Sequence, residues 1–477
     1  MLDDRLFLRR RALNDIDSSP DGQYVLCWLR HALRAFDNPI LDTAVALGNH
    51  LDRPVVVLHW IWREQPYASH RLLRFELEAS RSLEADLTER GLRFVRVVDQ
   101  PGTPLPVGKL LSAACALVTD DHPTSASQTF AYRAAKQSGK AVWLVDGACL
   151  VPMQAFPQEI QVTKAFRAAH TPQRVEHLAT PADLQPKTAQ YDGSLTVDHT
   201  PLPADALRLD ALIADCGVDM SLPPVPDFTG TRAAALDQLT WAIEAVVPRY
   251  RWTRNNPADP SSTTRLSPWM HYGLLGPREV AQAVHHAELH SSARWKFLDE
   301  LLTWREFYFH LAHHASDPAA YINVPAWGRA TLAAHTSDPR PEHYDLDALV
   351  HGESYDETWN AAQKQYLYDG WMHNNLRMYW VKKLIEWHAT PEEAWATACY
   401  LNDRFSLDGR HPATYGSIQW GFGRSKKGYR EIPIYGWVPP KSDRALRRRE
   451  GVPDWLAEQA ARAPYRVSVH SNLTVAG

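Results

Sequence analysis

Four hydroxyl side chains and an arginine precede a predicted helix start in the second half of the chain. The segment SSTTRLSPWMHYG covers residues 261–273, and its Ser267-Pro268 pair resembles a capping residue followed by a first-turn proline. A helix N-terminus offers free N–H groups and the positive end of the helix dipole, so the added hydroxyls and Arg265 suit a diphosphate. A long capping loop without a ligand explains the same residues equally well.

A carboxylate and an indole lie four residues apart in FLDELLTWREFYFH, residues 297–310. On a helix Glu300 and Trp304 would share one face. A carboxylate beside an aromatic plate suits recognition of a flat ligand that forms hydrogen bonds. The alternative is a partly buried helix that carries a surface pair of Arg305 and Glu306.

Three tryptophans are spaced so that they could form a series across two helices within residues 357–387. Trp380 and Trp387 are seven residues apart, which is two helical turns and roughly 10 Å along the axis, so both project from one face. Trp359 lies before the break at Asp369-Gly370 and can pack back from a neighbouring helix. Such a series could relay an electron between the surface and the interior, but aromatic residues at helical spacing also form ordinary cores.

Other chemistries find little support in the sequence. His310 and His314 stand at i, i+4, yet no third metal ligand is apparent, and the five cysteines form no C-x-x-C pair. No G-x-G-x-x-G, Walker A or G-x-S-x-G motif occurs. We therefore expect no metal site, no P-loop and no acyl-transfer nucleophile.

Two kinds of element must position these residues. From Tyr24 to about Pro152, β-branched runs alternate with amphipathic stretches, and this order predicts a doubly wound parallel sheet. From about Gln154 the chain becomes Pro-rich, and beyond Phe228 its patterns are helical, with a further start signal at Thr390-Pro391. We expect an α/β N-terminal domain over residues 1–152, a linker over 153–227 and a large all-α domain over 228–477.

Composition limits the partners of this chain. The 477 residues carry a formal net charge of -4, so contact with nucleic acid would need a local basic face. The longest apolar stretch, residues 55–62, is far short of the ~20 residues that a membrane helix needs. The first residues mix acidic and basic side chains and resemble no signal peptide. These features predict a cytoplasmic protein without a membrane segment.

The motifs taken together resemble the photolyase/cryptochrome family. Residues 28–41, WLRHALRAFDNPIL, resemble the W-x-R-x-x-L-R-x-x-D-N-P-x-L start of its α/β domain. The segments WNAAQ, LRMYWVKKLIEW, YLNDRFSLDGR and LSPWMHYG are similar to class II cyclobutane-pyrimidine-dimer photolyases. The resemblance extends from about Tyr24 to Val438 and implies an antenna-type N-terminal domain followed by a helical FAD-binding domain.

The resemblance implies which residues hold the FAD. Arg377 and Asp408 match a salt-bridged pair beside the isoalloxazine, and Asn402 matches an asparagine near flavin N5. The implied cofactor-binding set is Tyr250, Thr263, Thr264, Leu266, Ser267, Asn374, Arg377, Asn402 and Asp408. An antenna chromophore, deazaflavin or folate, would belong to the N-terminal domain, and the sequence does not identify it.

The resemblance also implies a lesion pocket and an electron path. Glu300 matches the carboxylate that binds the damaged pyrimidines, and Trp304 and Trp420 match the aromatic walls. Trp380, Trp359 and Trp387 match the electron-transfer chain, with Trp380 nearest the flavin. The remaining residues implied to contact DNA are Arg254, Asn255, Lys426, Lys427 and Arg430.

The implied activity is light-driven repair of cyclobutane pyrimidine dimers, by electron donation from reduced FAD to a lesion flipped out of UV-damaged DNA. A monomer with no obligate protein partner is expected. The alternative is a cryptochrome-like photoreceptor that signals to a protein partner, although the basic run at residues 441–449 favours DNA. The loop DGRHPATY departs from the class II pattern. If this loop supplied the N5 contact, Thr414 would replace the usual asparagine.

Overall fold

The computed structural model describes residues 4–179 and 183–469. The chain divides into two compact units. Unit 1 comprises the chain up to Thr240 with Leu266–Glu288 and Leu298–His310, and unit 2 comprises Trp241–Arg265, Leu289–Phe297 and the chain from Leu311 onward. The expected domain limits at residues 152 and 228 stay a prediction.

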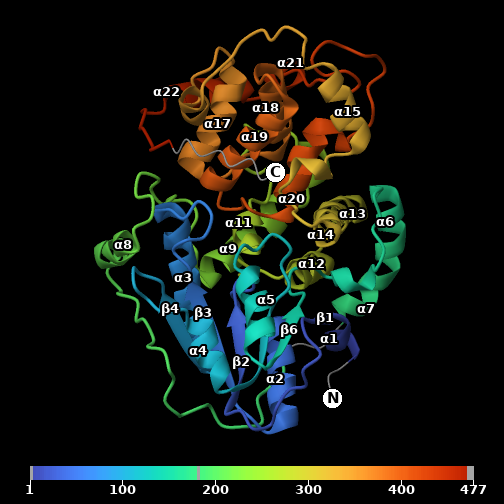
Figure 1. Ribbon diagram of the computed structural model, residues 1–477. Helices are drawn as coiled ribbons and strands as arrows, with labels where there is room; N and C mark the ends of the chain where they lie inside the picture. Colours follow the sequence, from blue (N-terminus) through green and yellow to red (C-terminus); the bar gives the residue numbers. More distant parts are fainter. Residues whose placement is uncertain (1–3, 180–182, 470–477) are drawn as a thin grey trace. The chain divides into compact units, whose positions relative to one another are not determined.

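Unit 1 is built on a six-stranded sheet with the order β1-β6-β5-β2-β3-β4 (Figure 1). Strands β2 to β6, which coincide with the β-branched runs, pair in parallel and are buried on both faces, as a doubly wound sheet requires. This confirms the predicted α/β fold class. The short strand β1, which the sequence analysis missed, pairs antiparallel with β6. The strand bounds are β1 Arg10–Ala12, β2 Tyr24–Leu29, β3 Val55–Ile61, β4 Arg93–Val98, β5 Ala114–Asp120 and β6 Ala141–Val145.

Helices pack on opposite faces of this sheet. Helices α4 and α5 contribute to a core cluster with Leu58 and Trp60 of β3, whereas α3 and α8 pack against Ile61, which points to the other face. The crossovers that join parallel strands therefore lie on both sides. The helices of this region are α1 Asp4–Leu8, α2 Pro39–Leu51, α3 His70–Glu89, α4 Pro106–Ser112, α5 Gln128–Gln137, α6 Thr163–His170, α7 Arg174–Leu178 and α8 Ala206–Asp215.

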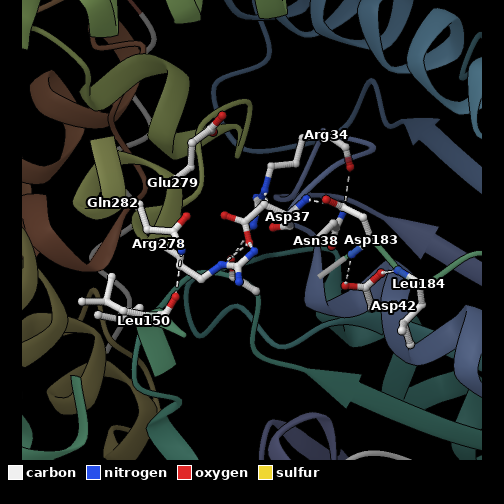
Figure 2. Close-up of polar contacts among 12 residues, drawn as sticks. Arg34, Asp37, Asn38, Asp42, Leu150, Asp183, Leu184, Arg278, Glu279 and Gln282 are labelled. Carbon is white, nitrogen blue, oxygen red and sulfur yellow. Dashed lines mark hydrogen bonds and ion pairs between the residues drawn. The ribbon is translucent and has the colours of Figure 1, made fainter. Parts of the chain in front are cut away.

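The Pro-rich segment after β6 is tied to the sheet layer by main-chain hydrogen bonds. The Asp42 carboxylate on α2 accepts from the backbone N–H groups of Asp183 (3.1 Å) and Leu184 (2.9 Å), and Asp183 accepts from the Asp37 N–H (Figure 2). Further along, the N–H of Thr200 donates to the Arg96 carbonyl of β4 at 2.8 Å. The segment thus adds contacts to unit 1 and is more than a spacer.

The described elements of unit 2 are helical, as predicted. Thr390 caps α19 in a capping box with Glu393, which confirms that start signal. The other start signal, in unit 1, differs from the prediction. Ser267 was expected to cap a helix but is the first residue of α11, and the N-cap position is Leu266, which makes no side-chain hydrogen bond. Helices after residue 228 are α9 Arg232–Trp241, α10 Tyr250–Thr253, α11 Ser267–His271, α12 Pro277–His286, α13 Ser291–Leu298, α14 Arg305–His314, α15 Ala326–Ala334, α16 Leu346–His351, α17 Glu357–Asp369, α18 Asn374–Trp387, α19 Pro391–Phe405, α20 Pro412–Gln419, α21 Arg444–Arg447 and α22 Val452–Ala461.

Within residues 4–179 and 183–469, three helical stretches are wound as π-helix, namely Ala242–Val246, Asp299–Trp304 and Trp420–Arg424, the last with a non-helical Gly423. Such wide turns are uncommon and occur frequently at functional sites. Two of these stretches contain residues expected in the lesion pocket. In the described part of the chain, no helix is long and apolar enough to cross a membrane.

The expected surface pair of Arg305 and Glu306 is wrong. Glu306 is buried and accepts from the backbone N–H of Leu150 at 2.6 Å and from His170 Nε2 at 2.7 Å. The Arg305 guanidinium donates to the Ala148 carbonyl at 2.8 Å. The segment that follows β6 covers this helix, so its charged residues bind main-chain groups and have little contact with water.

Candidate functional site

A buried ion pair lies between α18 and the loop after α19 in unit 2. Arg377 Nη2 stands 3.7 Å from Asp408 Oδ1, and both side chains are almost fully buried. The Ser406 hydroxyl donates to the same carboxylate oxygen. Buried charges are tolerated where they are paired in this way. The structure thus brings together two residues that the sequence analysis expected to form a pair.

Asn402, on α19, is fully buried beside this pair. Its Oδ1 accepts from the Tyr366 hydroxyl at 2.9 Å, and its Nδ2 donates to Asp403 Oδ1 at 2.7 Å. The loop after α19 passes so close that a Cβ on Gly409 would lie 2.8 Å from the Asn402 carbonyl oxygen. Thr414, the alternative N5 contact, uses its hydroxyl to donate to the His411 carbonyl at 2.8 Å.

The loop over residues 261–267, here called the hydroxyl loop, belongs largely to unit 2. It contacts the start of α18 through Ser262. Ser262 Oγ lies 3.4 Å from Nε2 of His373, the N-cap of α18, and the Arg265 guanidinium lies 4.9 Å from the Trp371 ring centroid. Burial and the nearby Arg265 lower the pKa of His373 to about 3, so the imidazole is neutral at pH 7. Thr263 and Thr264 are half-buried in this loop.

Other expected cofactor residues occupy varied surroundings. Tyr250 is half-buried and packs edge-on against Phe297 at 5.4 Å between ring centroids. Asn374 is exposed at the first position of α18. Leu266 and Ser267 belong to unit 1.

The three indoles expected in series are neighbours and are buried. Trp359 and Trp380 are stacked, with ring centroids 6.2 Å apart and an interplanar angle of 6°, and Trp359 meets Trp387 edge-on at 5.1 Å. Their order in space is therefore Trp380, Trp359, Trp387. The Tyr366 ring lies 5.6 Å from that of Trp380. Tyr366 also belongs to the Asn402 cluster, which consists of Asn402, Tyr366 and Asp403, so it joins the indole series to this cluster. At the other end, the half-exposed Tyr355 lies 6.0 Å from Trp387.

The residues expected to contact the lesion are divided between the units. In unit 1, Glu300 and Trp304 are half-buried within one π-helical stretch. Because a π-helix has a wider turn than the predicted α-helix, their expected α-helical spacing does not apply. In unit 2, Arg254, Asn255 and Trp420 are half-buried, and the basic residues Lys426, Lys427 and Arg430 are exposed.

Tight packing against α18 fixes the segment that carries Trp420. A Cβ on Gly421 would lie 2.3 Å from Val381 Cγ1, so only glycine fits there. The buried Lys382 donates through Nζ to the Gly421 carbonyl at 2.5 Å. Burial, with Lys441 nearby, lowers the pKa of Lys382 to about 7.

Several polar residues of unit 2 were not expected from the sequence. Tyr366 and Asp403 bind the two ends of the Asn402 amide, and His373 caps α18. Asn375 joins two expected DNA-contact regions, because its Nδ2 donates to the Asn255 carbonyl and its Oδ1 accepts from Lys441 Nζ. The position of Asp403 directly after Asn402 in YLND was the one local signal.

The N-terminal motif has a structural role in unit 1. The Asn38 side chain caps α2 by accepting from the N–H groups of Ile40 and Leu41. Arg34 donates to the carbonyls of Gly273 (2.9 Å) and Gly147 (3.3 Å), and Arg278 donates to Asp37 Oδ1 at 2.7 Å. These contacts, several of which appear in Figure 2, join loops of the α/β unit.

Comparisons with known proteins agree with this architecture. Residues 25–190 match the DNA photolyase family model. The chain is 28% identical to a deoxyribodipyrimidine photo-lyase of Methanothermobacter thermautotrophicus over 94% of this chain and 97% of that protein. A class III photolyase of Agrobacterium tumefaciens has a similar structure, with a TM-score of 0.64, 20% identity and coverage of 93% and 88%. An archaeal photolyase of Sulfolobus tokodaii with two FAD molecules is also similar in structure. Its TM-score is 0.64 at 18% identity, and the match covers 91% of this chain and 89% of that chain.

The fold of this chain, a doubly wound sheet in unit 1 and a helical unit 2, is the fold of these solved structures. Residues 25–190 thus match the DNA photolyase family, and the chain is similar to photolyases over most of its length. Its assignment to class II stays a prediction.

The family implies FAD, and residues of unit 2 fit this group. Arg377 Nε is buried and has no hydrogen-bond partner among the described residues, so it can donate to an acceptor on a ligand. Asn402 retains one N–H and one acceptor lone pair beyond its two observed bonds. The threonine hydroxyls of the 261–267 loop add donors of the kind a diphosphate needs.

Proposed function

We propose that this protein is a deoxyribodipyrimidine photo-lyase, which uses blue light and FAD to split cyclobutane pyrimidine dimers in DNA. The observation that carries the proposal is the buried series Trp380, Trp359, Trp387, which begins beside the Asn402 cluster. A relay of stacked indoles has a use where a buried cofactor must be re-reduced after light absorption. A flavoprotein of dark redox chemistry would not need it.

The proposed flavin site lies at the Arg377–Asp408 pair. When bound, FAD supplies the light absorption and the electron that opens the dimer. Arg377 donates to the flavin ring system, and Asp408 keeps the guanidinium in place. Asn402 faces flavin N5, while Tyr250, Thr263, Thr264, Leu266 and Ser267 hold the rest of the cofactor, with Asn374 at its edge.

The proposed lesion site uses Glu300, Trp304 and Trp420. A dimer must leave the base stack to reach a buried cofactor, and aromatic side chains can receive the flipped bases. Glu300 would hydrogen-bond the pyrimidine carbonyls on which negative charge develops. Arg254 and Asn255 lie on the lesion side, and the exposed Lys426, Lys427 and Arg430 neutralise phosphates.

We further propose a monomer that works in the cytoplasm and carries a light-harvesting chromophore in unit 1. The five free thiols fit a reducing compartment. The doubly wound sheet reverses its strand order between β2 and β5, the place where such sheets usually bind ligands. The two FAD molecules of the Sulfolobus structure support a second chromophore. Extraction of the purified protein would identify it by its absorption spectrum.

Repair itself is tested with purified, photoreduced protein and an oligonucleotide that contains a thymine dimer. Blue light should restore the thymine absorbance, and the dark sample should show no change. Absence of repair in the light, with FAD bound and photoreduced, would contradict the proposal and favour the photoreceptor alternative.

Glu300→Ala sharpens this test. It should slow repair while the flavin is still photoreduced at the wild-type rate. Glu288→Ala, which removes an exposed carboxylate after α12, is the matched control and should repair normally.

A further inference from the structure

The Asn402 amide is held at both ends by buried side chains from two helices. Tyr366 comes from α17 and donates its hydroxyl proton to Oδ1, whereas Asp403 follows Asn402 on α19 and accepts from Nδ2. All three side chains are at most 4% exposed. In such surroundings, water cannot replace either hydrogen bond.

Asp403 determines which end of the amide faces it. Its carboxylate also accepts from the backbone N–H of Arg410 and from the Tyr415 hydroxyl, each at 2.7 Å. Burial raises the pKa of Asp403. The hydrogen bonds from Arg410 and Tyr415 oppose this rise, because the carboxylate of Asp403 accepts them. A flipped amide would place Oδ1 against the carboxylate oxygen, so the amide NH2 must face Asp403.

Tyr366 completes the arrangement from the opposite side. Burial raises the pKa of Tyr366, so its hydroxyl remains a proton donor at every pH of interest. The ring also packs edge-on against Trp380, 5.6 Å between centroids, and lies 5.8 Å from the Arg377 guanidinium carbon. Loss of this hydroxyl would leave Oδ1 without its buried donor, so that only the hydrogen bond to Asp403 would hold the amide.

We propose that Tyr366 is a positioning residue that fixes the Asn402 amide toward the bound flavin. With one N–H and one lone pair already used, the amide has one donor and one acceptor left, in fixed directions. The inference rests on the proposed function, because it needs FAD at this site. It adds that the stability of the reduced flavin depends on the Tyr366 hydroxyl through its hydrogen bond to Asn402.

The test compares Tyr366→Phe with Tyr368→Phe. Tyr368 lies two residues away on the same helix, and its hydroxyl donates to the Ala463 carbonyl at 2.7 Å, so it provides a matched loss of one hydroxyl. FAD content is measured first, then flavin photoreduction with a thiol reductant, dark reoxidation in air and the midpoint potential. Tyr366→Phe should reoxidise about fivefold faster, the equivalent of one buried hydrogen bond. Tyr368→Phe should match wild type.

A double-mutant cycle with Asn402→Ala decides whether Tyr366 acts through Asn402. In the Asn402→Ala background, Tyr366→Phe should have no further effect on reoxidation or potential. A persisting effect would mean that Tyr366 acts through Trp380 or Arg377, and would overturn the inference. Wild-type reoxidation by Tyr366→Phe with full FAD content would also overturn it.

A second variant covers the case in which Tyr366→Phe is too unstable to purify. Asp403→Asn removes the group that dictates the amide orientation, so it should also speed reoxidation. Unchanged reoxidation there would count against the inference. A wild-type protein that binds and photoreduces FAD but repairs no DNA would defeat the proposed function alone, whereas wild type without FAD would defeat both.

Discussion

Buried polar groups of the two units offer contrasting examples of hydrogen bonding. In unit 1, buried arginines bond to main-chain carbonyls: Arg9 binds those of Asp146 and Cys149, and Arg34 binds that of Gly273. In unit 2, buried side chains bond to one another, as Tyr366 does to Asn402 and Trp380 Nε1 does to Gln363 Oε1 at 3.0 Å. A guanidinium on carbonyls holds loops together, whereas paired side chains can orient a ligand. Unit 1 also holds buried side-chain pairs, such as Glu306 with His170, so what distinguishes the candidate site of unit 2 is an amide that buried side chains hold at both ends.

The largest effect is expected for Trp380→Phe, which tests whether the side chains of unit 2 carry the chemistry. Because Trp380 is the indole next to the Asn402 cluster, its loss should abolish flavin photoreduction while leaving repair by chemically reduced protein largely intact. Absorbance of the illuminated flavin measures the first, and dimer repair the second. Trp395→Phe is the control, since Trp395 is also buried but donates to the Ala319 carbonyl and packs on Phe422. Loss of both activities in Trp380→Phe would contradict the relay role.

Glu306→Gln tests the contribution of a buried charge in unit 1 to stability. This change removes a buried charge that binds two backbone N–H groups and His170, so it should lower the free energy of unfolding by about 3 kcal/mol. Urea unfolding measures the loss, and Glu89→Gln, at an exposed position on α3, should show none. Photoreduction in native buffer should be unchanged. A marked loss of photoreduction would show that unit 1 interior residues influence the chemistry.

His373→Asn tests acid sensitivity at the start of α18. The folded pKa of His373, about 3, is below the unfolded value of 6.5, so the unfolded chain binds more protons between these values and stability falls as pH falls through that window. From pH 7 to pH 5 the wild type should lose about 2 kcal/mol from this group. Asparagine keeps a capping acceptor and should flatten the decline in urea unfolding.

His290→Asn is the control for that experiment. His290 Nδ1 also accepts from a backbone N–H two residues on, at 3.2 Å, but the side chain is exposed. Its replacement should leave the pH profile as in wild type. An equally steep acid decline in His373→Asn would contradict the assignment of this window to His373.

The smallest expected effect concerns the N-terminus of α19. Thr390→Ala removes the capping box of α19 and should cost about 1 kcal/mol of unfolding free energy. Thr336→Ala, at an exposed position, should change it by less than about 0.5 kcal/mol. Urea midpoints measure both. A photoreduction defect in Thr390→Ala would show that unit 2 transmits surface changes to the flavin site.

The sequence predicted the elements better than the contacts between them. The β-branched runs marked the parallel strands because buried strands need such residues, but three-residue β1 offered too short a pattern. The face shared by Trp380 and Trp387 follows from helical spacing, whereas the stacking of Trp359 depends on how α17 packs on α18. Tyr366 and Asn402 are 36 residues apart, so no local pattern could join them. The π-helical turn at Glu300 had no sequence signal either.

Additional segments cover both edges of the parallel sheet in unit 1. At one margin the short β1, with Arg10 and Arg11, pairs with β6, and at the other Thr200 pairs with Arg96 of β4. Exposed strand margins invite a second copy to add its own strands, and short charged strands or covering loops discourage this. A chain that is only partly folded would thus be protected from sheet-to-sheet aggregation. Deleting the residues around Thr200 should reveal that protection as light scattering at high protein concentration.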